Sequence, residues 1–323
     1  MPVFAFVFPG QGSQFPGMGA DLAEAFPVAR EVFQEVDDAL NQHLSKIIFE
    51  GPAEALTSTE NTQPALMAVS MAVLRVLEKE GGFTLGQKAT LVAGHSLGEY
   101  AALAAAGAFG VAQAARLLRL RGEAMQRAVP AGEGGMAALI GVDAEQARAI
   151  CEAAAVVSEE GKPDRLETIE LANDNGGGQI VISGQIGAIE RSLVIAKEKG
   201  AKRAVKLPVS APFHSSLMRP AADAMGEALE RETIAAPVVP LVANVTAAKV
   251  TAPDAICDLL VHQVTGTVRW RESVDAMAGM GVDTFVEIGA GKVLSGLIRR
   301  IAPDAAAQSV GSVADVEAFL KGA

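Results

Sequence analysis

Ser96 is the side chain in this sequence best placed for nucleophilic chemistry. It lies in Gly94-His95-Ser96-Leu97-Gly98, after a short apolar run and before an alanine-rich stretch. A serine between two glycines at a strand-to-helix turn is typical of a nucleophile elbow, because the glycines permit a sharp turn that exposes the hydroxyl. The amides that begin the next helix could then stabilise an oxyanion. The alternative is a purely structural turn.

A serine hydroxyl needs a base to become a nucleophile, and His214 is the candidate. It lies in Pro212-Phe213-His214-Ser215-Ser216, which we expect to be a loop between a strand and a helix, a common place for catalytic groups. A capping or packing role for His214 is the alternative. The other histidines have simpler interpretations: His43 as a surface residue, His95 as a neighbour that points away from Ser96, and His262 as a packed helical residue.

A second glycine-containing loop, Phe8-Pro9-Gly10-Gln11-Gly12-Ser13-Gln14, follows the first apolar run. In an open α/β sheet this is the carboxyl end of a strand, where ligands bind. The loop does not fit a dinucleotide site, because Phe15 stands where the third glycine is required, and Gly291-Lys292 does not fit a phosphate loop. The backbone amide of Gln11 could instead complete an oxyanion hole, or the loop could be only a tight turn.

Arg121 is a charged residue on a predicted apolar helix face. In the helix expected over 111–129 it shares a stripe with Ala114, Leu117, Leu118 and Met125. A buried guanidinium is costly unless an anion or several acceptors satisfy it. Its partner is either an internal Asp or Glu or, beside an acyl-transfer serine, a substrate carboxylate bound by two hydrogen bonds.

The composition excludes several classes of protein. The chain has 323 residues, 50% of them hydrophobic, with 27 Lys and Arg against 38 Asp and Glu, for a net charge of −11. This predicts about two domains with a sizeable core and disfavours nucleic acid or an anionic membrane as a partner. No apolar segment suits a signal peptide or the ~20 residues of a membrane span. The distant Cys151 and Cys257 argue against disulfides and zinc, so we expect a cytoplasmic protein without a metal.

Short apolar runs alternate with amphipathic stretches, a pattern that predicts an α/β fold with a mostly parallel sheet. The predicted buried strands are 3–8, 90–93, 239–244 and 284–288. The predicted helices are 65–80, 100–106, 111–129, 216–232, 255–264 and 293–301.

The middle of the chain has a different order of elements. Predicted strands and helices alternate as βαββαβ over 136–142, 144–155, 168–173, 179–183, 188–199 and 204–209. This order is typical of a ferredoxin-like arrangement. We therefore expect a small domain of residues 133–208 inserted into a discontinuous large domain of residues 1–132 and 209–323, with an exposed loop at 161–164.

Residues 197–206 contain five positive charges and one negative charge. The basic cluster consists of Lys197, Lys199, Lys202, Arg203 and Lys206. A solvated helix end whose cations complement the helix dipole is the ordinary interpretation. A docking patch for an acidic partner or for phosphates is the alternative.

Together these motifs resemble the malonyl-CoA:acyl carrier protein transacylase family of fatty acid synthesis. The resemblance runs in order through segments 8–14, 62–65, 94–100, 121–122, 135–138, 179–184, 212–214 and 287–289. It implies an α/β-hydrolase-like core with an inserted ferredoxin-like subdomain. It also implies ping-pong transfer of malonyl from malonyl-CoA to the phosphopantetheine thiol of acyl carrier protein, with no bound cofactor, and we expect a monomer.

The resemblance implies a role for each candidate residue. Ser96 would be the nucleophile and His214 the general base and then acid. Backbone amides of Gln11 and Leu97 would hold the oxyanion, and Arg121 would bind the malonyl carboxylate.

Three further residues are placed around the substrate by the same resemblance. Gln263 would provide the neutral oxygen that orients the histidine. Asn175 resembles an active-site asparagine, although three following glycines leave its alignment open. Phe213 is similar to the malonyl-selective form of its loop. An acidic carrier protein would dock on the basic cluster.

Two alternatives of other classes remain. An esterase or thioesterase could use the same Ser96–His214 pair, but the lack of an acidic third residue and the buried Arg121 argue against hydrolysis. A non-catalytic docking domain of a polyketide assembly system is the other alternative, and the intact serine and histidine argue against it.

Overall fold

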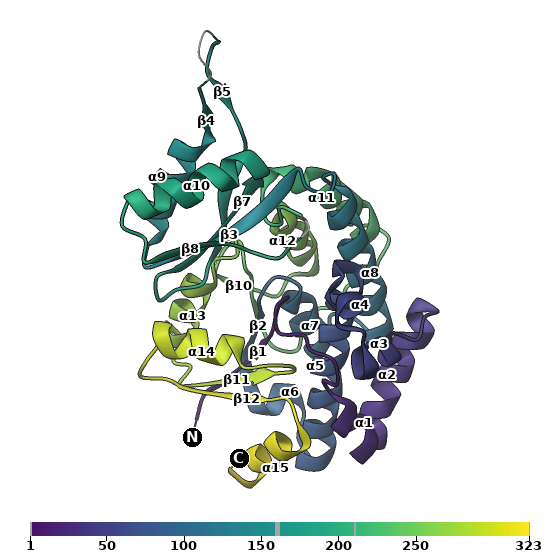
Figure 1. The fold of residues 1–323 in the computed structure, drawn as a ribbon. Coiled ribbons are helices and arrows are strands. Elements are labelled where there is room, and N and C mark those ends of the chain that lie inside the picture. Colours follow the sequence, from purple (N-terminus) through teal and green to yellow (C-terminus); the bar gives the residue numbers. More distant parts are fainter. Residues whose placement is uncertain (1, 159–161, 210, 323) are drawn as a thin grey trace.

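A computed structural model describes residues 2–158, 162–209 and 211–322 (Figure 1). Its central sheet has the strand order β10-β9-β2-β1-β11-β12, and the pairing of β10 with β9 is antiparallel while the others are parallel. The strands are β1 (Phe4–Phe8), β2 (Ala89–Gly94), β9 (Leu241–Val242), β10 (Lys249–Val250), β11 (Thr284–Ile288) and β12 (Ala306–Val310). The α/β prediction with a mostly parallel sheet is therefore confirmed.

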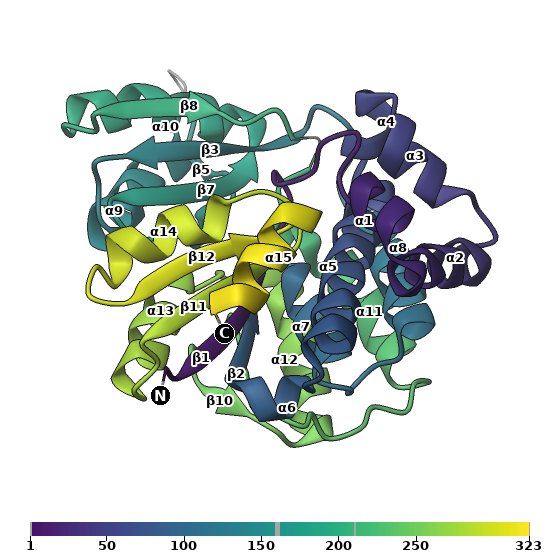
Figure 2. The ribbon, with the colours of Figure 1, turned by 90° about the horizontal axis from the view of Figure 1, so that it is seen from below.

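Helices cover both faces of this sheet (Figure 2). Side chains of β1 alternate between two cores: Phe6 and Phe8 pack towards α5, and Ala5 and Val7 pack towards α13. The helices around the sheet are α1 (Ala20–Ala25), α2 (Pro27–Leu40), α3 (Leu44–Glu50), α4 (Ala53–Thr57), α5 (Thr59–Gly81), α6 (Leu85–Lys88), α7 (Gly98–Ala105), α8 (Val111–Arg127), η1 (Ser216–Met218), α11 (Arg219–Leu229), α12 (Pro253–Thr265), α13 (Trp270–Gly279), α14 (Val293–Ile301) and α15 (Val313–Gly322).

A second, antiparallel sheet lies above the first in Figure 1 and has the strand order β6-β7-β3-β8. It is built from β3 (Gly134–Ile140), β6 (Ile169–Asp174), β7 (Gln179–Gln185) and β8 (Arg203–Lys206). Helices α9 (Ala144–Ala155) and α10 (Ile186–Glu198) share one apolar core with these strands. A short hairpin of β4 (Val156–Val157) and β5 (Arg165–Leu166) projects from this unit (Figure 1).

The register of β1 and β2 brings two predicted loops together. Phe8 pairs with Gly94 at the carboxyl ends of the two parallel strands, and the amide of His95 donates to the carbonyl of Phe8 at 3.0 Å. The loop that contains Gln11 and the turn that contains Ser96 therefore start from the same edge of the sheet.

Several predicted elements differ in extent. The helix expected from residue 65 begins at Thr59, because Pro64 is accommodated inside α5 and Thr62 Oγ1 hydrogen-bonds back to the carbonyl of Leu56 at 2.5 Å. The strand predicted over 239–244 is limited to β9, and the helix predicted over 216–232 divides into η1 and α11. Helices α1 to α4, α6, α13 and α15 and strands β4, β5, β10 and β12 were not predicted.

The structure also tests two predictions about exposure, one for His262 and one for the loop at 161–164. His262 is exposed, so its prediction as a packed residue is wrong: it lies on the solvent side of α12, while Leu260, Gln263 and Val264 form the buried stripe. In the loop predicted at 161–164, Gly161 lies outside the described residues, and the other three residues are exposed. Across the described chain, no helix is both long and apolar enough to span a bilayer.

Candidate active site

Ser96 lies at the turn between β2 and α7 with a left-handed backbone conformation, at φ 54°. A Cβ added at Gly94 would lie 1.9 Å from the backbone of Gly98, and one added at Gly98 would lie 2.2 Å from the carbonyl oxygen of Phe8. Glycine is therefore required on both sides of the serine. A strained residue held by such packing is a common feature of reactive sites.

His214 contacts the serine hydroxyl directly. Ser96 Oγ lies 2.7 Å from Nε2 of His214, and Nδ1 of His214 lies 2.8 Å from the carbonyl oxygen of Gln263. Because a carbonyl can only accept, Nδ1 carries the proton and Nε2 is free to accept from the hydroxyl. The pair has the geometry of a serine next to its base, and the group that orients the base is a neutral peptide oxygen.

The imidazole of His214 is held in its neutral form. Burial, together with the positive charge of Arg121, lowers the pKa of His214 to about 3. A neutral imidazole can accept a proton without first losing one. The histidine is thus in the protonation state of a general base over the physiological pH range.

Arg121 is buried at 1% exposure and binds neutral oxygens. It donates from Nη1 to Gln63 Oε1 at 2.7 Å, and from Nη2 to Gln263 Oε1 at 2.9 Å and to Ser96 Oγ at 3.2 Å. No carboxylate in the described part of the chain forms an ion pair with it. A buried cation without an ion-pair partner beside a nucleophile can bind the carboxylate of a ligand.

Gln263 contacts Arg121 but is not itself among the residues that line the pocket. Its Nε2 donates to Glu99 Oε2 at 2.6 Å, while its Oε1 accepts from Arg121. Glu99 is fully buried, and burial raises its pKa to about 7. One amide group therefore connects a buried carboxyl with a buried cation. The sequence analysis did not identify Glu99, although its place at the start of the helix after Ser96 was visible.

The proposed oxyanion donors have suitable positions. Gln11 and Leu97 both line the pocket beside Ser96. Among the described residues, neither backbone amide donates a hydrogen bond to a protein group. The amide of Ser96 itself is occupied by Asn244 Oδ1 at 2.8 Å. Two free amides next to a nucleophile can stabilise a developing negative charge.

A cavity of about 350 Å³ connects these groups and lies between the two sheets. The second sheet contributes Met136, Ala138, Asn173, Gln179 and Val181, and α14 contributes Val293, Leu294 and Leu297. Asn175 and Phe213 also line the cavity, and Asn175 Oδ1 lies 2.8 Å from His95 Nε2. The structure thus brings the predicted site residues together around one cavity, with Gln263 behind it.

The five residues of the predicted basic cluster are exposed at the end of α10, in the connection that follows and on β8. Lys206 ends β8, and the next residues, Leu207, Pro208 and Val209, line the cavity. The last residue of the cluster is therefore adjacent in the chain to residues of the cavity wall. Within the described residues, no group of three His, Cys, Asp or Glu side chains is arranged to hold a metal ion.

Comparison with known proteins places this geometry in a family. A family model described as an acyl transferase domain matches residues 5–318. The chain belongs to the acyl transferase family. The prediction of an acyltransferase enzyme is thereby confirmed.

Individual members of the acyl transferase family are similar over nearly the whole chain. The chain is 48% identical to the malonyl CoA-acyl carrier protein transacylase of Bacillus subtilis, over 93% of this chain and 91% of that protein. An acyl-carrier-protein-S-malonyltransferase structure from Bartonella henselae is 57% identical with a TM-score of 0.93, covering 99% of both chains. A structure of a type II PKS acyl-carrier protein in complex with its malonyl-transacylase contains a chain that is 43% identical with a TM-score of 0.93, covering 99% of this chain and 100% of that chain. These names agree with the family resemblance inferred from the motifs.

Proposed function

We propose that this acyl transferase moves a malonyl group from malonyl-CoA to the phosphopantetheine thiol of an acyl carrier protein, for fatty acid synthesis. One observation carries the proposal: Ser96 Oγ lies between the neutral Nε2 of His214 at 2.7 Å and the buried Nη2 of Arg121 at 3.2 Å. A nucleophile, its base and a carboxylate-binding cation therefore meet at one oxygen. The names of the similar proteins support the same substrates.

The first half-reaction uses the groups around Ser96. His214 Nε2 accepts the hydroxyl proton while Oγ attacks the thioester carbonyl, and the amides of Gln11 and Leu97 hold the oxyanion. The C–S bond then breaks, and His214 returns the proton to the CoA thiolate. A malonyl ester of Ser96 and free CoA result.

The second half-reaction reverses these roles. His214 accepts the proton of the phosphopantetheine thiol, the thiolate attacks the malonyl ester, and Ser96 recovers its proton when the C–O bond breaks. Because CoA leaves before the second thiol enters, the kinetics are ping-pong. Only side chains and backbone amides take part, so the chemistry needs no bound cofactor.

Arg121 selects the acyl group in this proposal. The malonyl carboxylate accepts from the guanidinium, whereas an acetyl group would leave that buried charge without an anion. Phe213 and Asn175 line the same cavity and limit its shape around the acyl group.

We infer that residues 133–208 form a ferredoxin-like domain inserted into an α/β-hydrolase-like core of residues 1–132 and 209–323. The separate apolar core shared by β3, β6, β7, β8, α9 and α10 supports this division. The cavity between the two units would give the substrates access to Ser96. We also propose that the protein acts in the cytoplasm as a monomer.

Brief mixing with malonyl-CoA followed by an intact-protein mass spectrum tests the function. We expect one added malonyl group, which disappears when pantetheine is supplied and is recovered as malonyl-pantetheine. Rapid release of free malonate without transfer to the thiol would instead indicate a hydrolase. No adduct at all would indicate a non-catalytic domain.

We expect no histidine inflection in the rate of malonyl-enzyme formation when the pH is lowered from about 8 to about 5. An ordinary histidine would give a loss of rate centred on its pKa of about 6.5. His214 has its pKa lowered to about 3, so it stays neutral throughout this range. Single-turnover rates across pH check this. Burial raises the pKa of Glu99 to about 7, which adds an inflection of its own, so Glu99→Gln is the control that removes it. An inflection near 6.5 that persists in Glu99→Gln would contradict the assignment to a buried, neutral His214.

Reversing two charges in the basic cluster should weaken carrier-protein binding. For Lys202→Glu with Arg203→Glu we expect the KM for carrier protein to rise about tenfold at low salt, because rim charges steer an acidic partner. The KM for pantetheine, which lacks the protein, should stay within about twofold. Steady-state kinetics with both acceptors measure this. Equal changes in the two KM values would show that the cluster is only a solvated helix end.

A further inference from the structure

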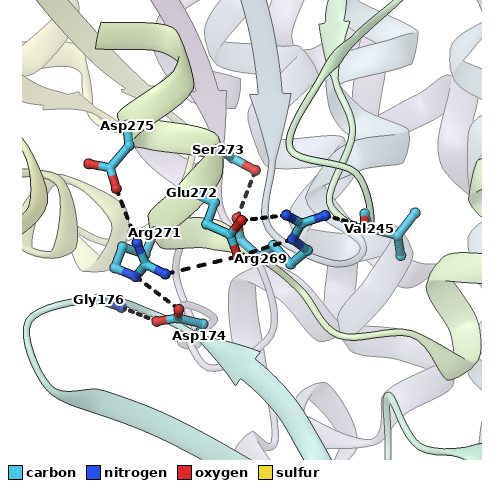
Figure 3. A network of polar contacts seen from close by, with 8 residues as sticks. All are labelled: Asp174, Gly176, Val245, Arg269, Arg271, Glu272, Ser273 and Asp275. Atoms are coloured by element: carbon cyan, nitrogen blue, oxygen red, sulfur yellow. Dashed lines mark hydrogen bonds and ion pairs between the residues drawn. The ribbon is translucent and has the colours of Figure 1, made fainter. Parts of the chain in front are cut away.

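An ion pair joins the two units beside the cavity (Figure 3). Asp174 is the last residue of β6 in the second sheet, and Arg271 lies in the first turn of α13, which packs on the central sheet. Arg271 Nε donates to Asp174 Oδ2 at 2.9 Å. The carboxylate side chain is 6% exposed and the guanidinium is 42% exposed, so the acidic partner is the buried one.

Backbone hydrogen bonds next to this ion pair also connect the two units. Val268 pairs with Asn173 in a parallel bridge, its amide donates to the carbonyl of Ala172 at 2.8 Å, and its carbonyl accepts from the amide of Asp174 at 3.0 Å. Thr267 Oγ1 donates to the carbonyl of Leu171 at 2.6 Å. The end of β6 is therefore attached to the segment that leads into α13.

Asp174 also holds the turn that follows it. Its Oδ1 accepts from the amide of Gly176 at 3.2 Å, as Figure 3 shows. Gly176, Gly177 and Gly178 all have positive φ, a backbone conformation that glycine adopts without the steric cost of a Cβ. The carboxylate thus adds a side-chain restraint to a turn that is also held by backbone hydrogen bonds from Asn175 to Gln179, from Gln179 to Gly176 and from Gly141 to Gly178.

The restrained turn forms part of the cavity wall. Asn173, Asn175 and Gln179 line the cavity, and Asn175 contacts His95, the neighbour of Ser96, at 2.8 Å. A shift of the Asp174 turn would therefore move the cavity wall next to the nucleophile. Displacements of about 1 Å in such positions can change rates about 100-fold.

We propose that the Asp174–Arg271 pair is a latch that fixes this wall, and that both residues are positioning residues that keep water from the acyl-enzyme. The inference rests on the proposed function. In the unwanted reaction, water attacks the malonyl ester, the C–O bond to Ser96 breaks, Ser96 takes up the proton through His214, and free malonate leaves. A thiol held by a fixed wall would react first, whereas a loosened wall would admit water.

The test compares Arg271→Gln and Asp174→Asn with Asp275→Asn. Asp275 is the matched control, because its Oδ2 also contacts Arg271, at 3.3 Å, but it lies on α13 itself and is 51% exposed. Each full-length protein is loaded with malonyl-CoA and freed of CoA, and decay of the malonyl-enzyme is followed by intact mass with and without pantetheine. Melting temperatures are recorded in parallel.

We expect the ratio of hydrolysis to transfer to rise about tenfold in Arg271→Gln and in Asp174→Asn, and to stay within about twofold in Asp275→Asn, since exposed ion pairs contribute little. In the double variant, the ratio of hydrolysis to transfer should equal that of the more affected single variant, because both substitutions break the same ion pair.

Folded variants that keep the wild-type ratio, or a double variant in which the two effects multiply, would overturn the latch. Arg271 is partly exposed, so Arg271→Gln still decides the question if Asp174→Asn does not fold. If wild-type protein forms no malonyl-enzyme, the proposed function fails instead, which distinguishes the two failures.

Discussion

Ser96→Ala is expected to abolish the malonyl-enzyme and to lower the transfer rate by about 10⁴-fold or more. The hydroxyl lies 2.7 Å from its base, so its removal takes away the group that would form the malonyl ester. The fold should survive, because alanine keeps the Cβ, and the hydrogen bonds of the hydroxyl to the described residues are those with His214 and Arg121. Labelled malonyl-CoA, followed by denaturation and detection of bound label, measures the effect.

The matched control is Ser158→Ala, which removes an exposed hydroxyl beside the projecting hairpin. It should label like the wild-type protein. Label that remains covalently bound to Ser96→Ala after denaturation would show that another residue carries the acyl group. The role of His214 as its base would then also be wrong.

Arg121→Ala is expected to change the choice of acyl group. Loss of the buried guanidinium should lower kcat/KM for malonyl-CoA by about 10²- to 10³-fold, in line with about 3–5 kcal/mol for one partner of a buried ion pair. Acetyl-CoA has no carboxylate, so its kcat/KM should fall much less. The ratio of the two kcat/KM values is the measurement, because a general disturbance through Gln63 or Gln263 would affect both substrates.

Arg116→Ala provides the control for Arg121→Ala, since Arg116 is an exposed arginine on the same helix, α8. It should leave the malonyl-to-acetyl ratio unchanged. An unchanged ratio in Arg121→Ala as well would show that the carboxylate is recognised elsewhere. The buried cation would then serve only to hold Gln63, Gln263 and Ser96 in place.

The sequence predicted those parts of the fold that follow from local patterns. The apolar runs of β1 and β11 and the stripe of α8 match the structure closely, because burial on a strand or a helix face imposes a short period on the sequence. The short helices α1, α3 and α4 have too few turns for such a period to appear. The helix predicted over 65–80 was started too late, because α5 begins at Thr59 and includes Pro64, with Thr62 Oγ1 bonded back to the carbonyl of Leu56.

In the candidate site, too, residues with informative sequence neighbours were predicted, and residues that are linked only through the fold were not. Ser96 and Arg121 were found from their immediate neighbours in the sequence. Glu99 was not, because its importance depends on Gln263, which is distant in the sequence and reaches it only through the fold. The Asp174–Arg271 pair is invisible for the same reason, since nothing near either residue indicates the other.

The hydrogen bond from Arg121 Nη2 to Ser96 Oγ has a consequence for the order of events. That N–H occupies a lone pair of the oxygen that must attack, so the hydrogen bond partly blocks the nucleophile. A carboxylate is a stronger acceptor than a hydroxyl, and its arrival would draw the N–H away. We therefore expect the carboxylate of the acyl donor to free Ser96 Oγ for attack. Reagents that acylate serine should react slowly with the enzyme unless they carry a negative charge at the correct distance.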